Sequence, residues 1–138
     1  MPPGEYTVYT PRYTVYTLSD LTSRRYISLT TFKRDGTPVS TPVWVVSDDG
    51  ERLLVWSASK TWKVRRIRRN PHALVAPSNF RGKERGDRLE ATARLIEHPR
   101  IEELLHQKYG WQKRALDWLN RDSGTEWATI ELTGRASR

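Results

Sequence analysis

The chain has 138 residues, no cysteine and a formal net charge of +8. This length predicts one domain with a sizeable core, and the lack of cysteine excludes disulfides, thiolate catalysis and cysteine-based metal sites. The excess of basic residues favours an anionic partner such as nucleic acid, an anionic membrane or a phosphorylated small molecule, although a solvated basic surface explains the same charge.

The N-terminal segment, residues 1–19, is expected to be an extended arm, and residues 20–138 are expected to form the folded domain. The arm contains YTVYT at residues 6–10 and again at 13–17, and Tyr, Val and Thr favour strands. It lacks the basic region and apolar run of a signal peptide, and no stretch of the sequence approaches the ~18 apolar residues of a membrane span. We therefore expect a cytoplasmic protein without a membrane partner.

After the arm, the sequence predicts three strands joined by short turns. Residues 26–32, 39–46 and 53–56 are rich in Val, Thr, Leu and aromatic residues, which favour strands. The turns contain Asp-Gly, and glycine accepts the positive φ that such turns need. The pattern predicts an antiparallel meander, in which Pro42 lies at an edge or a bulge because it has no N–H to donate.

A short basic helix is predicted over residues 62–69. Ser59 or Thr61 can cap its start, and the Asn-Pro pair that follows ends it. Val64 and Ile67 lie three residues apart on one face and are expected to contact the core.

The remaining sequence predicts three more strands and a helical region. The helical pattern carries Ile101, Leu104 and Leu105, and it resumes after Gly110. The economical fold is mainly β, a small antiparallel barrel with peripheral helices, because closure removes exposed strand edges. The expected segments are strands over 73–76 and 89–96 around a polar, solvated loop over 78–88, helices from about residues 98 and 111, and a last strand over 127–132.

The start of the basic helix is the best candidate for a binding site. A helix N-terminus offers free N–H groups and the positive end of the helix dipole. Ser57, Ser59 and Thr61 supply hydroxyl groups just before it, and Lys63 adds a charge within the first turn. Together these groups predict a phosphate site, with a capped surface helix and a solvated basic face as the alternative.

Other catalytic constellations are lacking in the sequence. His72, His98 and His106 are scattered without metal-ligand spacing, so no metal site is expected. There is no G-x-S-x-G nucleophile motif and no isolated acid–base pair, so no catalytic residue is assigned. Hydride transfer remains compatible with such a site, because the coenzyme then carries the reactive atom.

Several runs of the sequence resemble the pyridoxamine 5'-phosphate oxidase-like superfamily, and within it the group of deazaflavin-dependent oxidoreductases. The most specific are G-x-P-x-x-T-P-V-W at residues 36–44 and the helix start T-x-K ending in R-R-N-P at residues 61–71. ALVAPSNFRG, KYGWQKRALDW and WATIEL are also similar, so the resemblance extends over residues 20–132. Group members often carry Cys-Asp where this chain has Ser78 and Asn79.

The resemblance implies a six-stranded antiparallel split β-barrel of the FMN-binding type, assembled as a homodimer with coenzyme clefts between the subunits. It implies that the phosphate lies near the helix start and that the ring lies along residues 41–44. The cofactor-binding residues that it implies are Thr41, Pro42, Val43, Trp44, Ser57, Thr61, Trp62, Lys63, Arg66, Ala76, Pro77 and Ser78.

The leading hypothesis is an oxidoreductase that transfers a hydride between a deazaflavin coenzyme (coenzyme F-420) and a small organic substrate. The alternatives are an FMN-dependent reductase or oxidase of the same fold, and a carrier that holds a flavin or tetrapyrrole without turnover. A nucleic-acid-binding module ranks last, because no helix-turn-helix or RNP-like motif is present, and we expect no nucleic-acid partner.

Overall fold

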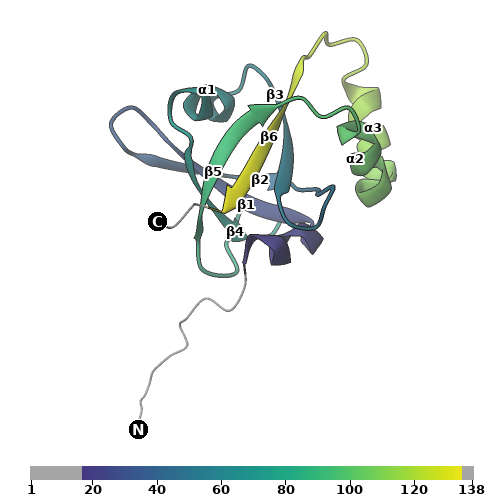
Figure 1. The fold of residues 1–138 in the computed structure, drawn as a ribbon. Helices are drawn as coiled ribbons and strands as arrows, with labels where there is room; N and C mark the ends of the chain where they lie inside the picture. The colour runs from purple at the N-terminus through teal and green to yellow at the C-terminus, as the bar shows by residue number, and fades with distance from the viewer. Residues whose placement is uncertain (1–16, 135–138) are drawn as a thin grey trace, which may run out of the picture.

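Six antiparallel strands form one curled sheet in the order β2-β1-β4-β5-β6-β3 (Figure 1). The computed structural model describes residues 17–134, and residues 1–16 of the expected arm lie outside it. The predicted fold class, a mainly β split barrel, is confirmed. The strands are β1 (Tyr26–Phe32), β2 (Pro38–Trp44), β3 (Leu53–Ala58), β4 (His72–Pro77), β5 (Leu89–Ile96) and β6 (Trp127–Gly134).

The folded part begins inside the segment that was expected to be an arm. A 3₁₀ helix, η1 (Leu18–Ser23), starts after Thr17, whose backbone N–H donates to the Asp20 carboxylate over 2.8 Å. Leu18 and Leu21 are buried in the barrel core. The sequence pattern gave no sign of this turn, because six residues are too few to show a helical period.

The expected meander is wrong at its third strand. β1 and β2 form the predicted hairpin, but β3 pairs along its whole length with β6. Only an isolated bridge between Val46 and Leu54 joins the chain after β2 to β3. Alternation in a sequence identifies a strand but not its partner, and here β3 crosses to the far edge of the sheet. The barrel is therefore split between β2 and β3.

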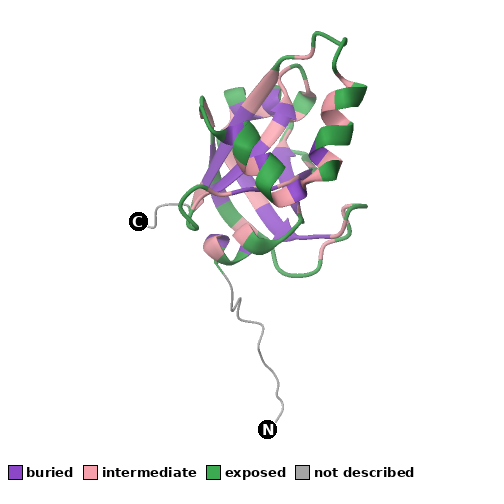
Figure 2. Ribbon diagram, turned by 90° about the vertical axis from the view of Figure 1, so that its right-hand side faces the viewer, coloured by how far each residue is buried: buried purple, intermediate pink, exposed green. Residues whose placement is uncertain are grey.

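Alternate strand residues fill the barrel, as Figure 2 shows by the purple stretches of the sheet. Ile27, Val55 and Ile130 are fully buried there. Helix α1 (Trp62–Arg69), whose bounds match the prediction, adds Val64 and Ile67 to the same cluster. Helix α1 is thereby fixed to the barrel core by its apolar face.

Pro42 lies on the edge strand β2, as predicted, but the loop over residues 78–88 is not simply solvated. Ser28 donates a hydrogen bond of 2.8 Å to Glu84 of this loop. Gly82 has φ of +88°, and a Cβ there would approach Pro42 Cδ to 3.2 Å. The loop thus packs over β1 and β2, and glycine is needed both for its backbone angle and for the close approach.

Two helices, α2 (Ile101–Tyr109) and α3 (Trp111–Leu119), lie beside the barrel. Ile101 and Leu105 of α2 pack on Leu54 of β3 in a second apolar cluster, in agreement with the predicted stripe. Helix α3 has an inverted burial pattern, because Trp111 and Leu119 are 74% and 73% exposed whereas Lys113 is fully buried. No described helix is both long and apolar enough to cross a membrane.

The C-terminal end of α2 ties the end of β2 to the start of β1. The Tyr109 hydroxyl accepts the Val45 N–H over 2.9 Å and donates to the Arg25 carbonyl over 2.7 Å. Burial raises the pKa of Tyr109 to about 12, so the hydroxyl keeps its proton at neutral pH. Lys108 donates to the carbonyls of Thr22 and Val45. These bonds fix the chain where it leaves β2.

Replacing Tyr109 by Phe is expected to lower the free energy of unfolding by about 1–3 kcal/mol, because the buried Val45 N–H loses its acceptor. Chemical denaturation measures the effect. Tyr26→Phe is the matched control, since the Tyr26 hydroxyl has no hydrogen bond within residues 17–134, and it should cost less than about 0.5 kcal/mol. Equal losses in both variants would contradict this role of Tyr109.

Candidate functional site

A pocket of about 340 Å³ lies at the split of the barrel and is called here the split pocket. The end of β2, the end of β3, the start of α1 and the start of β6 form its walls, and β1 and α3 contribute one side chain each. It exists because β3 pairs with β6 and leaves β2 without a partner on that side. Its lining residues are Tyr26, Pro42, Val43, Trp44, Trp56, Ser57, Ala58, Thr61, Lys63, Leu116 and Trp127.

One end of the split pocket is the start of α1. Thr61 is the N-cap residue, but its side chain makes no capping bond to the helix. Its hydroxyl instead donates to the Ala58 carbonyl over 3.0 Å and lies 3.2 Å from the Ser57 hydroxyl. No side-chain cap therefore occupies the N–H groups of the first turn, which can bind an anion together with the helix dipole.

Lys63 stands in this first turn without a counter-ion. It forms no ion pair and no hydrogen bond within residues 17–134. Burial, and to a lesser degree the nearby Arg66 charge, lower the pKa of Lys63 below its ordinary value. An unpaired, partly desolvated ammonium is unfavourable in the free protein, and an anion placed beside it would remove that cost.

The rest of the split pocket is aromatic. The rings of Trp56 and Trp127 stack at 4.0 Å between centroids and 12° between planes. Trp44 stacks on Tyr109 at 4.2 Å, which couples this wall to the bonds that hold Val45. Lys113 Nζ lies 4.4 Å from the Trp56 centroid. The walls are thus flat and held in place by their own packing, which suits a planar ligand ring.

The structure brings together half of the predicted site residues and separates the others. Trp62 and Arg66 line a different hollow, next to the β1–β2 hairpin. Thr41 is half-buried on β2 and leaves its Oγ1 without a partner in the described chain. The buried residues of 76–78 lie at the end of β4 beside β1 and line neither pocket. The six that line the split pocket are Pro42, Val43, Trp44, Ser57, Thr61 and Lys63.

Sequence reasoning missed the aromatic wall. Trp56 and Trp127 were assigned only to strands, and Leu116 was not assigned to a site. Alternation could have placed Trp56 on the face opposite Val55, and so outside the barrel core. It could not have placed Trp127 against Trp56, because that contact depends on the pairing of β3 with β6.

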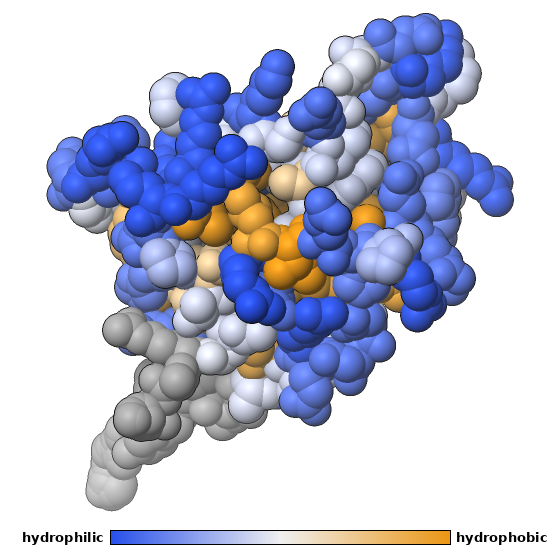
Figure 3. Space-filling model, turned by 45° about the horizontal axis from the view of Figure 1, so that its top comes forward, coloured by the Kyte–Doolittle hydropathy of each residue, from blue (hydrophilic) through white to orange (hydrophobic). Residues whose placement is uncertain are grey.

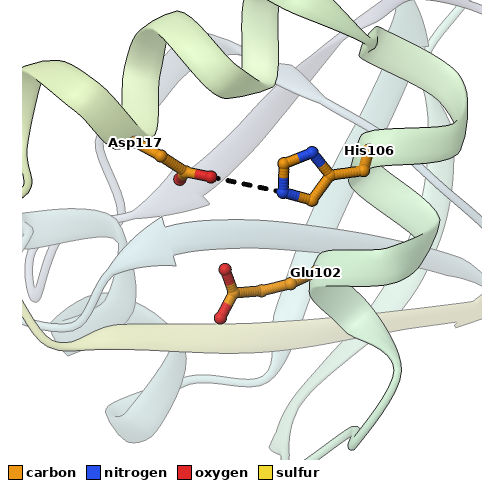
Figure 4. Close-up of side chains that lie close together, drawn as sticks. All are labelled: Glu102, His106 and Asp117. Carbon is orange, nitrogen blue, oxygen red and sulfur yellow. Dashed lines mark ion pairs between the residues drawn. The ribbon is translucent and has the colours of Figure 1, made fainter.

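Three potential metal ligands, Glu102 and His106 of α2 and Asp117 of α3, lie within 4.8 Å of one another (Figure 4). His106 Nε2 is 3.3 Å from Asp117 Oδ2. The buried Lys113 ammonium already pairs with both carboxylates. Since a cation occupies this position, the cluster is an ion-pair network that joins α2 to α3.

The described residues thus form a split barrel whose cleft combines aromatic walls with an uncapped helix start. Residues 18–132 match the sequence profile of the pyridoxamine 5'-phosphate oxidase family, and the chain belongs to that family. The sequence matches no curated protein.

Several solved structures share the fold of this chain. A conserved hypothetical protein from Mycobacterium tuberculosis has 19% identity and a TM-score of 0.63, covering 94% of this chain and 87% of that one. The haem storage protein HutZ from Vibrio cholerae has 15% identity and a TM-score of 0.59, covering 83% and 84%. An FMN-binding, pyridoxamine 5'-phosphate oxidase-related protein from Nostoc punctiforme has 14% identity and a TM-score of 0.53, covering 83% and 73%. At these identities the likeness shows the fold.

Replacing Lys63 by Met is expected to leave the free protein at least as stable as the wild type at neutral pH, because the variant buries no unpaired charge. Between the lowered pKa of Lys63 and the ordinary value of ~10.4, the unfolded chain binds more protons, so wild-type stability rises with pH in that interval. The advantage of Lys63→Met should therefore shrink as the pH rises towards ~10.4.

Denaturation curves at several pH values measure this difference. The exposed neighbour Lys60 provides the control, since Lys60→Met changes a surface residue and should alter the free energy of unfolding at neutral pH by less than about 0.5 kcal/mol. A clear loss of stability in Lys63→Met at neutral pH would mean that Lys63 has a stabilising partner in the folded protein.

Proposed function

We propose that this protein is a flavin- or deazaflavin-dependent oxidoreductase that binds its coenzyme in the split pocket. The observation that carries the proposal is the position of Lys63, unpaired and partly buried at an uncapped helix start beside stacked tryptophans. Such a site offers positive charge and N–H groups for a phosphate and flat walls for a ring. The FMN-binding relative from Nostoc punctiforme supports a flavin as the class of ligand.

Bound in this way, the coenzyme would supply the hydride chemistry. The residues of the chain then have three tasks. Lys63, Thr61 and Ser57 would hold the phosphate, Trp44, Trp56 and Trp127 would position the ring, and their packing would exclude water. Lys63 and Tyr26 are the only titratable residues that line the split pocket, so its described walls provide no carboxylate or histidine for acid–base catalysis.

Two observations favour the deazaflavin over FMN. The sequence most resembles the deazaflavin-dependent group, and the net charge of +8 suits a coenzyme that carries both a phosphodiester and a glutamate tail. A carrier without turnover is the second candidate, supported by the same lack of acid–base groups and by the haem storage protein of this fold. Coenzyme titration followed by single-turnover hydride transfer to a redox dye separates the enzyme from the carrier.

A homodimer is part of the proposal. Trp111, Trp118 and Leu119 of α3 are 74%, 62% and 73% exposed, and their spacing of seven and eight residues places them on one side of the helix. Burying such surface against a second copy would satisfy it, and a twofold arrangement is the commonest solution. Light scattering at micromolar concentration is expected to give twice the chain mass of 16.1 kDa. A monomer mass would reject the dimer and any site shared between subunits.

Lys63→Ala is expected to weaken coenzyme binding by about 10- to 100-fold, because a charge-assisted hydrogen bond to phosphate is worth roughly 1.5–3 kcal/mol. Fluorescence titration with FMN and with the deazaflavin coenzyme measures the loss. Arg68→Ala, an exposed cation on the same helix, is the control and should change the affinity less than about twofold. If both variants bind the coenzymes as tightly as the wild type, the phosphate does not lie at Lys63.

A further inference from the structure

A second hollow, called here the hairpin pocket, lies between the β1–β2 hairpin and the side of α1 that faces away from the barrel core. It encloses about 550 Å³, which is within the range of roughly 300–1,000 Å³ typical of small-molecule sites. In Figure 3, hydrophilic side chains gather on the side of the molecule that carries this hairpin and α1. The lining residues are Lys33, Arg34, Asp35, Trp62, Arg66 and Arg69.

The lining of the hairpin pocket has four cations and one carboxylate. That carboxylate, on Asp35, accepts the Thr37 N–H over 2.9 Å, and this bond lowers the pKa of Asp35. The Asp35 charge therefore stabilises the hairpin turn. Arg69 donates to the Phe32 carbonyl over 2.9 Å, which joins α1 to the hairpin. Within residues 17–134, Arg66 has no ion pair. A structural bond therefore holds the two walls of this open pocket together, and the lining keeps an excess of positive charge.

Trp62 gives the hairpin pocket an aromatic wall. Its side chain is 65% exposed although it stands in the first turn of α1, and the Arg65 guanidinium lies 4.9 Å from its ring centroid. An exposed tryptophan can stack a planar ring, and a guanidinium can bind two phosphate oxygens at once. Trp62 and Arg66 share one side of α1, four residues apart, so one ligand can contact both.

We propose that the hairpin pocket is a second binding site for a small ligand that carries a planar aromatic ring and a phosphate, such as a nucleoside monophosphate. The ring stacks on Trp62, and the phosphate binds Arg66 with the neighbouring cations. Lys63 lines the split pocket and Trp62 lines the hairpin pocket, so the first turn of α1 separates the two ligands. This site does not depend on the coenzyme proposed for the split pocket.

Isothermal titration with AMP, adenosine and inorganic phosphate tests the proposal on the wild type and three variants. Arg66→Gln should weaken AMP and phosphate by about 10- to 100-fold, whereas Arg68→Gln, the matched exposed cation, should change them less than about twofold. Trp62→Leu should weaken AMP by about fivefold or more and leave phosphate unchanged, because only the ring uses Trp62. Thermal unfolding checks that each variant is folded.

Titration of AMP into protein saturated with FMN or the deazaflavin coenzyme tests whether the sites are separate. An unchanged AMP affinity supports the proposal, as does an unchanged AMP affinity in Lys63→Ala. If neither coenzyme binds, the proposed function fails while AMP binding still stands. The second site would be overturned by any of three results. These are competition between AMP and the coenzyme, absence of AMP binding, and an equal loss of AMP affinity in Arg66→Gln and Arg68→Gln. If the protein binds a single-stranded oligonucleotide tightly, and Arg66→Gln and Arg68→Gln weaken that binding equally, this face is a nucleic-acid surface instead.

Discussion

The pairing of β3 with β6, instead of with β2, determines where the barrel splits and where the split pocket lies. It moves β3 across the barrel and leaves β2 as the other edge of the sheet, joined to β3 only at Val46 and Leu54. An unpaired edge normally invites association or must be covered. Here the gap between the edges becomes a pocket, and the bonds of Tyr109 to Val45 and Arg25 keep its β2 side in place.

Two lysines of this protein differ in whether the fold supplies a partner for their charge. Lys113 is fully buried, but it pairs with Glu102 and Asp117, so it joins α2 to α3 and supports Trp56. Lys63 has a lowered pKa and no pair in the described chain. The two carboxylates stabilise the charge of Lys113 within the fold. The charge of Lys63 lowers the stability of the protein as long as no anion is bound beside it. This contrast is the physical basis for the proposal that a phosphate binds at Lys63.

The local elements could be predicted from sequence, because period and turn chemistry are local. The bounds of β1, β5 and α1 agree with the expected ranges, and Val64 and Ile67 are buried as expected. Strand pairing is not local, so the meander was wrong and the Trp56–Trp127 wall was missed. The burial of Lys113 could not be predicted either, because the two carboxylates that pair with it come from different helices. Trp62 and Arg66 were expected in one site with Lys63, but both line the other pocket. Trp62 precedes Lys63 directly and therefore points in another direction. Arg66 is three residues further on and close enough for its charge to lower the pKa of Lys63, but only the structure shows which pocket it lines.

A crystal structure of the protein with its bound coenzyme would show directly whether the phosphate lies at Lys63. The phosphate is expected within hydrogen-bond distance of Lys63 and the Thr61 hydroxyl, and the ring system against Trp44, Trp56 and Trp127. The hairpin pocket is expected to hold no part of the ring system. A phosphate bound by Arg66 and Arg69, with Lys63 free of any contact to the coenzyme, would contradict the proposed site.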